Sequence, residues 1–135
     1  MDEVRTAAEA LTTDSVKGLC ININEFHLTQ YVKAFGGGWG KGETINTPEN
    51  AQGLQYLIDL YQEGVAITPS EAGLGWDGEV FAKGLCAMST GGVWYTATLE
   101  ELAPDMNYEI IRVPKGTTWG CTSHSDTNVV LSSTE

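Results

Sequence analysis

The residues of this sequence that most clearly suggest chemistry are its four tryptophans, which lie beside glycine or in turn-like stretches. They are Trp39, Trp76, Trp94 and Trp119. Core tryptophans usually belong to the apolar stripe of a helix or strand, and these four follow no such stripe. An indole face stacks on the apolar face of a sugar ring, while neighbouring acidic and amide groups bond the hydroxyls. The pattern favours a carbohydrate site; the alternative is that at least two of them fill the core, Trp119 foremost.

Paired carboxylates are a second candidate chemistry, because a glycosidase holds two of them across the bond that it cleaves. Glu25, Asp77 and Glu79 are the residues that could supply such a pair. In a chain with 18 acidic residues, however, such combinations arise by chance. We therefore expect a binding protein without catalytic residues, and a small hydrolase remains the minor alternative.

Histidine and cysteine are too sparse and too scattered for a local metal site. His27 and His124 lie far apart, and Cys20, Cys86 and Cys121 form no C-x-x-C motif. We expect both histidines at the surface or in turns, Cys20 and Cys86 as small buried residues, and neither a metal ion nor a cofactor.

The glycine-rich stretch 36–42 fails the test for a phosphate-binding loop. That motif needs a glycine at position 35 and a serine or threonine at position 42, where this chain has Phe35 and Gly42. The stretch is better interpreted as a flexible loop that presents Trp39 as a ligand contact.

Composition excludes several classes of partner. The 135 residues carry a formal charge of −11, and 41% of them are hydrophobic. Such an acidic surface repels nucleic acid and anionic lipid. There is no apolar run near the roughly 20 residues that a membrane helix needs, and residues 1–5 lack the pattern of a signal peptide. We expect one globular domain over residues 1–135, with no membrane insertion.

Alternating helix and strand signals place these residues on an α/β fold. Helical spacing of apolar residues predicts helices over 2–11, 26–35, 48–63, 78–83 and 93–102. The third has the clearest start, with Thr47 as cap, Pro48 in the first turn and Glu49 beside the positive helix end. Strands are predicted over 19–23, 85–89, 108–113 and 128–131. In the first of these, Leu19, Ile21 and Ile23 alternate with Cys20 and Asn22, as in a half-buried strand.

Several short motifs occur in a recognisable order: A-A-E-A-L-T at 7–12, T-P-E-N-A at 47–51, D-L-Y-Q-E-G at 59–64, F-A-K-G-L-C-A-M at 81–88, G-V-W at 92–94 and V-P-K-G at 113–116. In this order and spacing the chain resembles the extracellular solute-binding proteins of sugar ABC transporters, of the maltose and multiple-sugar type. One departure is Leu85, where the family has lysine.

The resemblance implies a fold, a function and site residues. Family members have two lobes, and residues 1–135 match most of the second, C-terminal lobe of a type II periplasmic-binding-protein-like fold, with a small mixed sheet packed with helices. The implied function is non-catalytic binding of a sugar or oligosaccharide for uptake. The full-length parent would act in the periplasm or at the extracellular surface, with the transporter permease as its partner.

The family's site residues map onto five positions here. Trp94 and Tyr95 match the aromatic pair that stacks on the sugar. Glu25 and His27 follow the first strand, where relatives place ligand contacts, and Trp76 lies in a loop that faces the cleft. A lobe without its partner lobe leaves a surface uncovered, so an interaction domain that forms homodimers is the main alternative function.

Overall fold

The computed structural model describes residues 1–122, and helices and strands alternate along them. Their order is α1 (Asp2–Leu11), β1 (Lys17–Cys20), α2 (Glu25–Ala34), the 3-10 helix η1 (Gly40–Gly42), α3 (Pro48–Gln62), β2 (Ala66–Ile67), α4 (Asp77–Ala82), β3 (Cys86–Met88) and α5 (Trp94–Leu102). The α/β class predicted from the sequence is confirmed. None of the helices in this part of the chain is long and apolar enough to cross a membrane.

Three short strands form a sheet in the order β2–β1–β3. Both pairings are parallel, and Leu19 of β1 lies opposite Ala66 of β2 and Met88 of β3. Within residues 1–122 the sheet is therefore parallel, and the expected mixed sheet is corrected. Parallel neighbours cannot be joined by a tight turn, so helices supply the crossovers between them.

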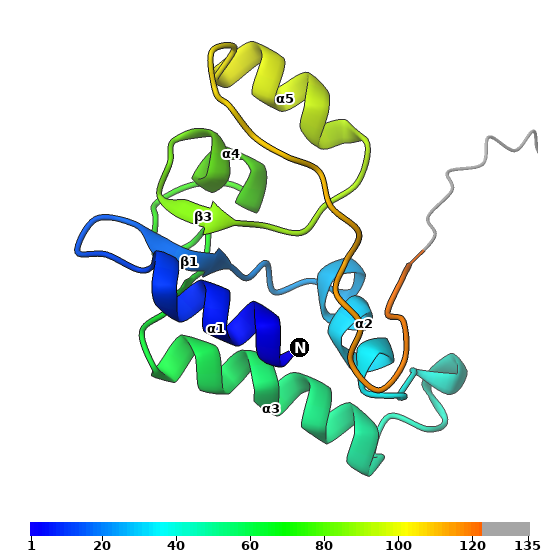
Figure 1. Cartoon of the computed structure of the whole chain (residues 1–135). Coiled ribbons are helices and arrows are strands. Elements are labelled where there is room, and N and C mark those ends of the chain that lie inside the picture. Colours follow the sequence, from blue (N-terminus) through cyan, green and yellow to red (C-terminus); the bar gives the residue numbers. More distant parts are fainter. Residues whose placement is uncertain (123–135) are drawn as a thin grey trace, which may run out of the picture.

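Helices cover both faces of this sheet (Figure 1). Helices α1 and α3 lie on one side of the sheet, and α4 and α5 lie on the other. Leu19 packs into the core on the α1–α3 side, whereas Cys20 packs with Val80 and Cys86 in a second cluster. Cys20 and Cys86 are thus buried, as predicted.

The alternating burial expected for residues 19–23 is wrong. Leu19 and the adjacent Cys20 are both buried, because β1 is the central strand of a sheet covered on both faces. Ile23 was expected on the buried face of this strand, but it lies beyond the end of β1 and is 72% exposed.

The predicted start of α3 is confirmed. Thr47 caps α3, its hydroxyl accepting a hydrogen bond from the backbone N–H of Asn50 at 3.2 Å, and Pro48 occupies the first turn. Gly64 follows the helix with φ of +74°, a conformation that glycine adopts without steric cost. Asn24 caps α2 by accepting from the backbone N–H of His27 at 3.0 Å.

Two strand predictions have different outcomes. Residues 108–113 form no strand, because no neighbouring strand lies beside them in the described part of the chain and none of their backbone groups is hydrogen-bonded there. The strand predicted over 128–131 lies outside the described residues. Sequence patterns did not reveal β2 or η1, which are two and three residues long.

Candidate functional site

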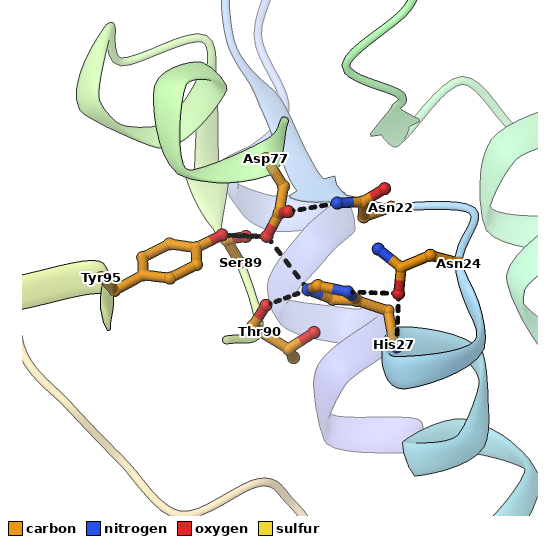
Figure 2. A network of polar contacts seen from close by, with 7 residues as sticks. All are labelled: Asn22, Asn24, His27, Asp77, Ser89, Thr90 and Tyr95. Atoms are coloured by element: carbon orange, nitrogen blue, oxygen red, sulfur yellow. Dashed lines mark hydrogen bonds and ion pairs between the residues drawn. The ribbon is translucent and has the colours of Figure 1, made fainter. Parts of the chain in front are cut away.

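A buried polar network lies where β1 and β3 end and where α2, α4 and α5 begin (Figure 2). Its central residue is Asp77, the first residue of α4, whose side chain is fully buried. Open α/β sheets bind ligands beyond the carboxyl ends of their parallel strands, so the network occupies the edge where a site is expected.

Four side chains from different segments donate hydrogen bonds to the Asp77 carboxylate. Asn22 Nδ2 bonds Oδ1 at 2.5 Å, and His27 Nε2 lies 3.1 Å from Oδ2. The hydroxyls of Ser89 and Tyr95 also bond Oδ2. A single carboxylate thereby connects the end of β1, the first turn of α2, the end of β3 and the first turn of α5.

The hydroxyls of Ser89 and Tyr95 lie side by side at the Asp77 carboxylate. Ser89 Oγ lies 2.6 Å from the Tyr95 hydroxyl, and both oxygens are within reach of Asp77 Oδ2. Each hydroxyl carries one proton, which it donates to Asp77 Oδ2. Burial and the hydrogen bond to Asp77 raise the pKa of Tyr95, which keeps this donor protonated.

The network holds Asp77 in its charged form. Burial by itself raises the pKa of a carboxyl group. Here the hydrogen bonds donated by His27, Tyr95 and Asn22 outweigh burial, and the pKa of Asp77 lies below its ordinary value. The carboxylate is an anion whose donors are fixed in place.

His27 is a buried member of this network, which corrects the expectation of a surface histidine. Its Nε2 also lies 2.6 Å from the Thr90 carbonyl oxygen, and its Nδ1 lies 3.0 Å from Asn24 Oδ1. His124 lies outside the described residues. Within residues 1–122, no group of three or more His, Cys, Asp or Glu side chains is placed to hold a metal ion.

An open hollow of about 640 Å³ lies along one face of α2, next to the buried network. Positions 25, 29 and 33 follow one another at intervals of four along the helix, so they share a face. The residues that line the hollow are Glu25, Phe26, Thr29, Lys33, Trp39, Trp94, Cys121 and Thr122.

Trp39 is anchored at this hollow. Its indole Nε1 donates to Thr29 Oγ1 at 2.5 Å. The surrounding loop is held by the buried amide of Asn50, whose Oδ1 accepts from Gly38 N at 2.8 Å and whose Nδ2 donates to Gly38 O at 2.9 Å and Ile45 O at 2.8 Å. The loop was expected to be flexible, but these bonds tie it to the first turn of α3. No periodicity signals this role of Asn50.

Trp94 lines the other part of the hollow and is 42% exposed. The rings of Trp94 and Phe26 meet edge to face, with centroids 5.2 Å apart. The adjacent Tyr95 reaches inward to Asp77, and the ring of Trp76 packs edge-on against Tyr95 at 5.1 Å. The buried network thus supports the helix start that carries Trp94.

The residues predicted as ligand contacts fall into two layers. Glu25, Trp39 and Trp94 line the hollow. His27 and Tyr95 lie beneath it in the buried network, and Trp76 packs against Tyr95 rather than lining the hollow. Sequence reasoning missed the contributions of Asn22, Thr29, Lys33 and Ser89, which are too common in surface loops and helices to stand out.

Trp119 is not a core residue, which corrects the alternative expectation for it. Its side chain is exposed, and the guanidinium of Arg112 lies 4.9 Å from its ring centroid. Trp119 does not line the hollow, so it provides a natural control for Trp94.

Comparison of the chain with protein-family models, with curated proteins and with solved structures finds no match. The function of this chain is therefore inferred from its own residues and their geometry.

Proposed function

We propose that this chain binds a carbohydrate non-catalytically, as one lobe of an extracellular solute-binding protein that delivers sugars to an ABC transporter. One observation carries the proposal. Trp39 and Trp94, presented by different segments, line the same hollow together with Glu25 and Lys33. Indole faces for the ring and charged groups for the hydroxyls are the two requirements of sugar recognition.

The size of the hollow and the preorganisation of its side chains support this proposal. Its volume of about 640 Å³ lies in the usual range for small-molecule sites. The hydrogen bond from Trp39 to Thr29 fixes one indole before any ligand arrives, which lowers the entropy lost on binding.

The motifs shared with sugar-binding proteins and the position of the site support assignment as a lobe. The network and the hollow lie at the edge where β1 and β3 end, and in two-lobed binding proteins a ligand is trapped by closure of one lobe on the other. One lobe supplies only part of the contacts, so we expect this chain to bind sugar weakly.

Replacing Trp94 by alanine tests the proposal directly. We expect the variant to bind the preferred sugar about tenfold more weakly or not at all, because a stacking face and its buried area are lost. Calorimetric titration with malto-oligosaccharides, trehalose and monosaccharides, into the millimolar range, measures the affinity. Trp119→Ala is the matched control and should bind as the parent does. A folded parent that binds none of these sugars would contradict carbohydrate binding by this chain.

A hydrolase receives less support from the geometry. A glycosidase needs one protonated carboxyl as general acid. The pKa of Asp77 is lowered and its oxygens accept four hydrogen bonds, and Glu79 Oε2 accepts from Gly75 N at 2.8 Å. Of the three carboxylates considered, only Glu25 lines the hollow.

Exposed apolar residues favour a second candidate function, association of two copies of the chain. Val93 is 88% exposed, and Ile110 and Ile111 are 74% and 66% exposed. Residues 108–113 form neither helix nor strand, and no other described residue bonds their backbone groups. Exposed apolar side chains beside unpaired backbone are typical of a surface that associates.

Light scattering after size-exclusion chromatography tests this second candidate. We expect a concentration-dependent dimer that Ile110→Glu together with Ile111→Glu converts to a monomer, since two charges would be buried in the interface. Ile45→Glu, at an exposed position in the loop before α3, should leave the dimer unchanged. A monomeric parent at high protein concentration would exclude this candidate.

A further inference from the structure

The hollow contains two charged side chains, Glu25 and Lys33, that have no hydrogen-bond or ion-pair partner among the side chains that the structure describes. Some acidic groups of this part of the chain are paired, among them Glu63 with Arg5, and Glu71 with Tyr61 and Thr68. Lys33 lies eight positions after Glu25, which corresponds to about 12 Å along α2. The hollow is therefore acidic towards one end and basic towards the other.

Aromatic side chains lie at the acidic end. Glu25 precedes Phe26, and the ring of Phe26 is 5.2 Å from that of Trp94. A carboxylate and an indole face both attract an ammonium group, the first by a charge-assisted hydrogen bond and the second through its ring quadrupole. Lys33 repels a cation at the far end, so the two charges would also orient a ligand along the helix.

The negative net charge of the whole chain also favours a cationic ligand. With 7 basic and 18 acidic residues, the formal net charge is −11, and such a field raises the concentration of cations near the surface. Lys33 is the one basic side chain that lines the hollow among the residues described.

We propose that the hollow prefers sugars with a free amino group, such as unacetylated glucosamine oligosaccharides. The ammonium group binds between Glu25 and Trp94, and the remaining ring or rings extend past Trp39. This inference rests on the proposed carbohydrate function and specifies the class of sugar.

Calorimetric titration with three matched disaccharides tests this preference. They are the β-1,4-linked dimer of glucosamine, its N-acetylated form and cellobiose, which differ only at C2 of each ring; glucosamine and glucose form a parallel pair of monosaccharides. At low salt we expect the amino sugar to bind about tenfold more tightly than its uncharged counterparts, and we expect the difference to shrink as salt is added.

Three substitutions test which side chain causes the preference for the amino sugar. Glu25→Gln keeps the shape of the side chain and should remove the preference for the amino sugar. Lys33→Gln should increase the preference a few-fold. Glu100→Gln changes the net charge equally at an exposed position on α5 that does not line the hollow, and it should preserve the preference.

The outcomes separate the two proposals. The inference is overturned if the parent binds charged and uncharged sugars equally well, or if it binds only uncharged sugars. Either result leaves the proposed carbohydrate binding unaffected. A loss in Glu100→Gln as large as that in Glu25→Gln overturns the contact at Glu25, because net charge alone would then account for the preference. If no sugar binds to the folded parent, both proposals fail.

Discussion

Replacement of Asp77 by alanine is expected to lower the free energy of unfolding by about 3–5 kcal/mol, because removing a buried carboxylate leaves its buried hydrogen-bond donors without an acceptor. Asn22, His27 and Tyr95 would all lose the oxygen to which they donate. Each buried donor left unpaired carries a desolvation cost of about 1–3 kcal/mol, and relaxation around the vacated position keeps the total loss below the sum of three such costs.

Urea unfolding followed by circular dichroism measures this effect. Asp105→Ala is the control, since Asp105 is exposed and no other described residue bonds its side chain. We expect that variant to unfold with the parent to within about 0.5 kcal/mol. Equal stabilities of Asp77→Ala and Asp105→Ala would show that the network contributes nothing to the fold.

The same carboxylate makes stability depend on pH. The pKa of Asp77 in the folded protein lies below its ordinary value, and in the unfolded chain it returns to about 3.9. The resulting stabilisation is therefore complete above the unfolded pKa and is lost as the pH falls through the lower, folded pKa. The difference in stability between the parent and Asp77→Asn should be largest at neutral pH and should shrink below about pH 4. A difference that grows towards acid pH would contradict this account.

Replacement of Gly18 by alanine is the second large effect that we expect, and it arises from backbone contact between α1 and β1. A Cβ atom at Gly18 would lie 2.0 Å from the carbonyl oxygen and 2.4 Å from the Cα of Ala8. Backbone atoms cannot rotate away as the end of a side chain can, so α1 would have to move off the sheet. Overpacking usually costs about 1–3 kcal/mol, and this position should reach or exceed the upper value.

Gly38→Ala serves as the matched control for this substitution, because a Cβ atom there meets nothing within 4 Å. Thermal unfolding should place the control near the parent and Gly18→Ala well below it. If Gly18→Ala unfolds with the parent, α1 and β1 do not pack as closely as the structure has them.

Local signals in the sequence determined most of the helices. The start of α3 could be predicted because Thr47 and Pro48 satisfy and shape the first turn without any distant partner. Helix α1 runs over the predicted residues, because its apolar positions recur with the period of the helix. Caps and apolar periodicity depend only on residues a few positions apart, so they can be recognised from the sequence alone.

Strands were predicted less accurately from the sequence, because a strand forms only where another strand pairs with it. Residues 108–113 have the composition of a strand but pair with nothing in the described part of the chain, whereas the two residues of β2 form a strand because β1 lies beside them. β-Propensity measures fit to a pleated, half-buried surface, and only tertiary structure decides whether that surface exists.

The candidate site also contains some residues that the sequence could predict and others that only the tertiary structure reveals. The sequence by itself singled out Trp39 and Trp94 through their unusual setting, and Glu25 and Tyr95 through a family resemblance. Only the tertiary structure could bring Asp77 to His27, fifty residues away in the chain, and place Asn50 beneath the loop of Trp39. Buried polar groups are selected by hydrogen-bond partners that are distant in sequence, and local pattern contains no record of them.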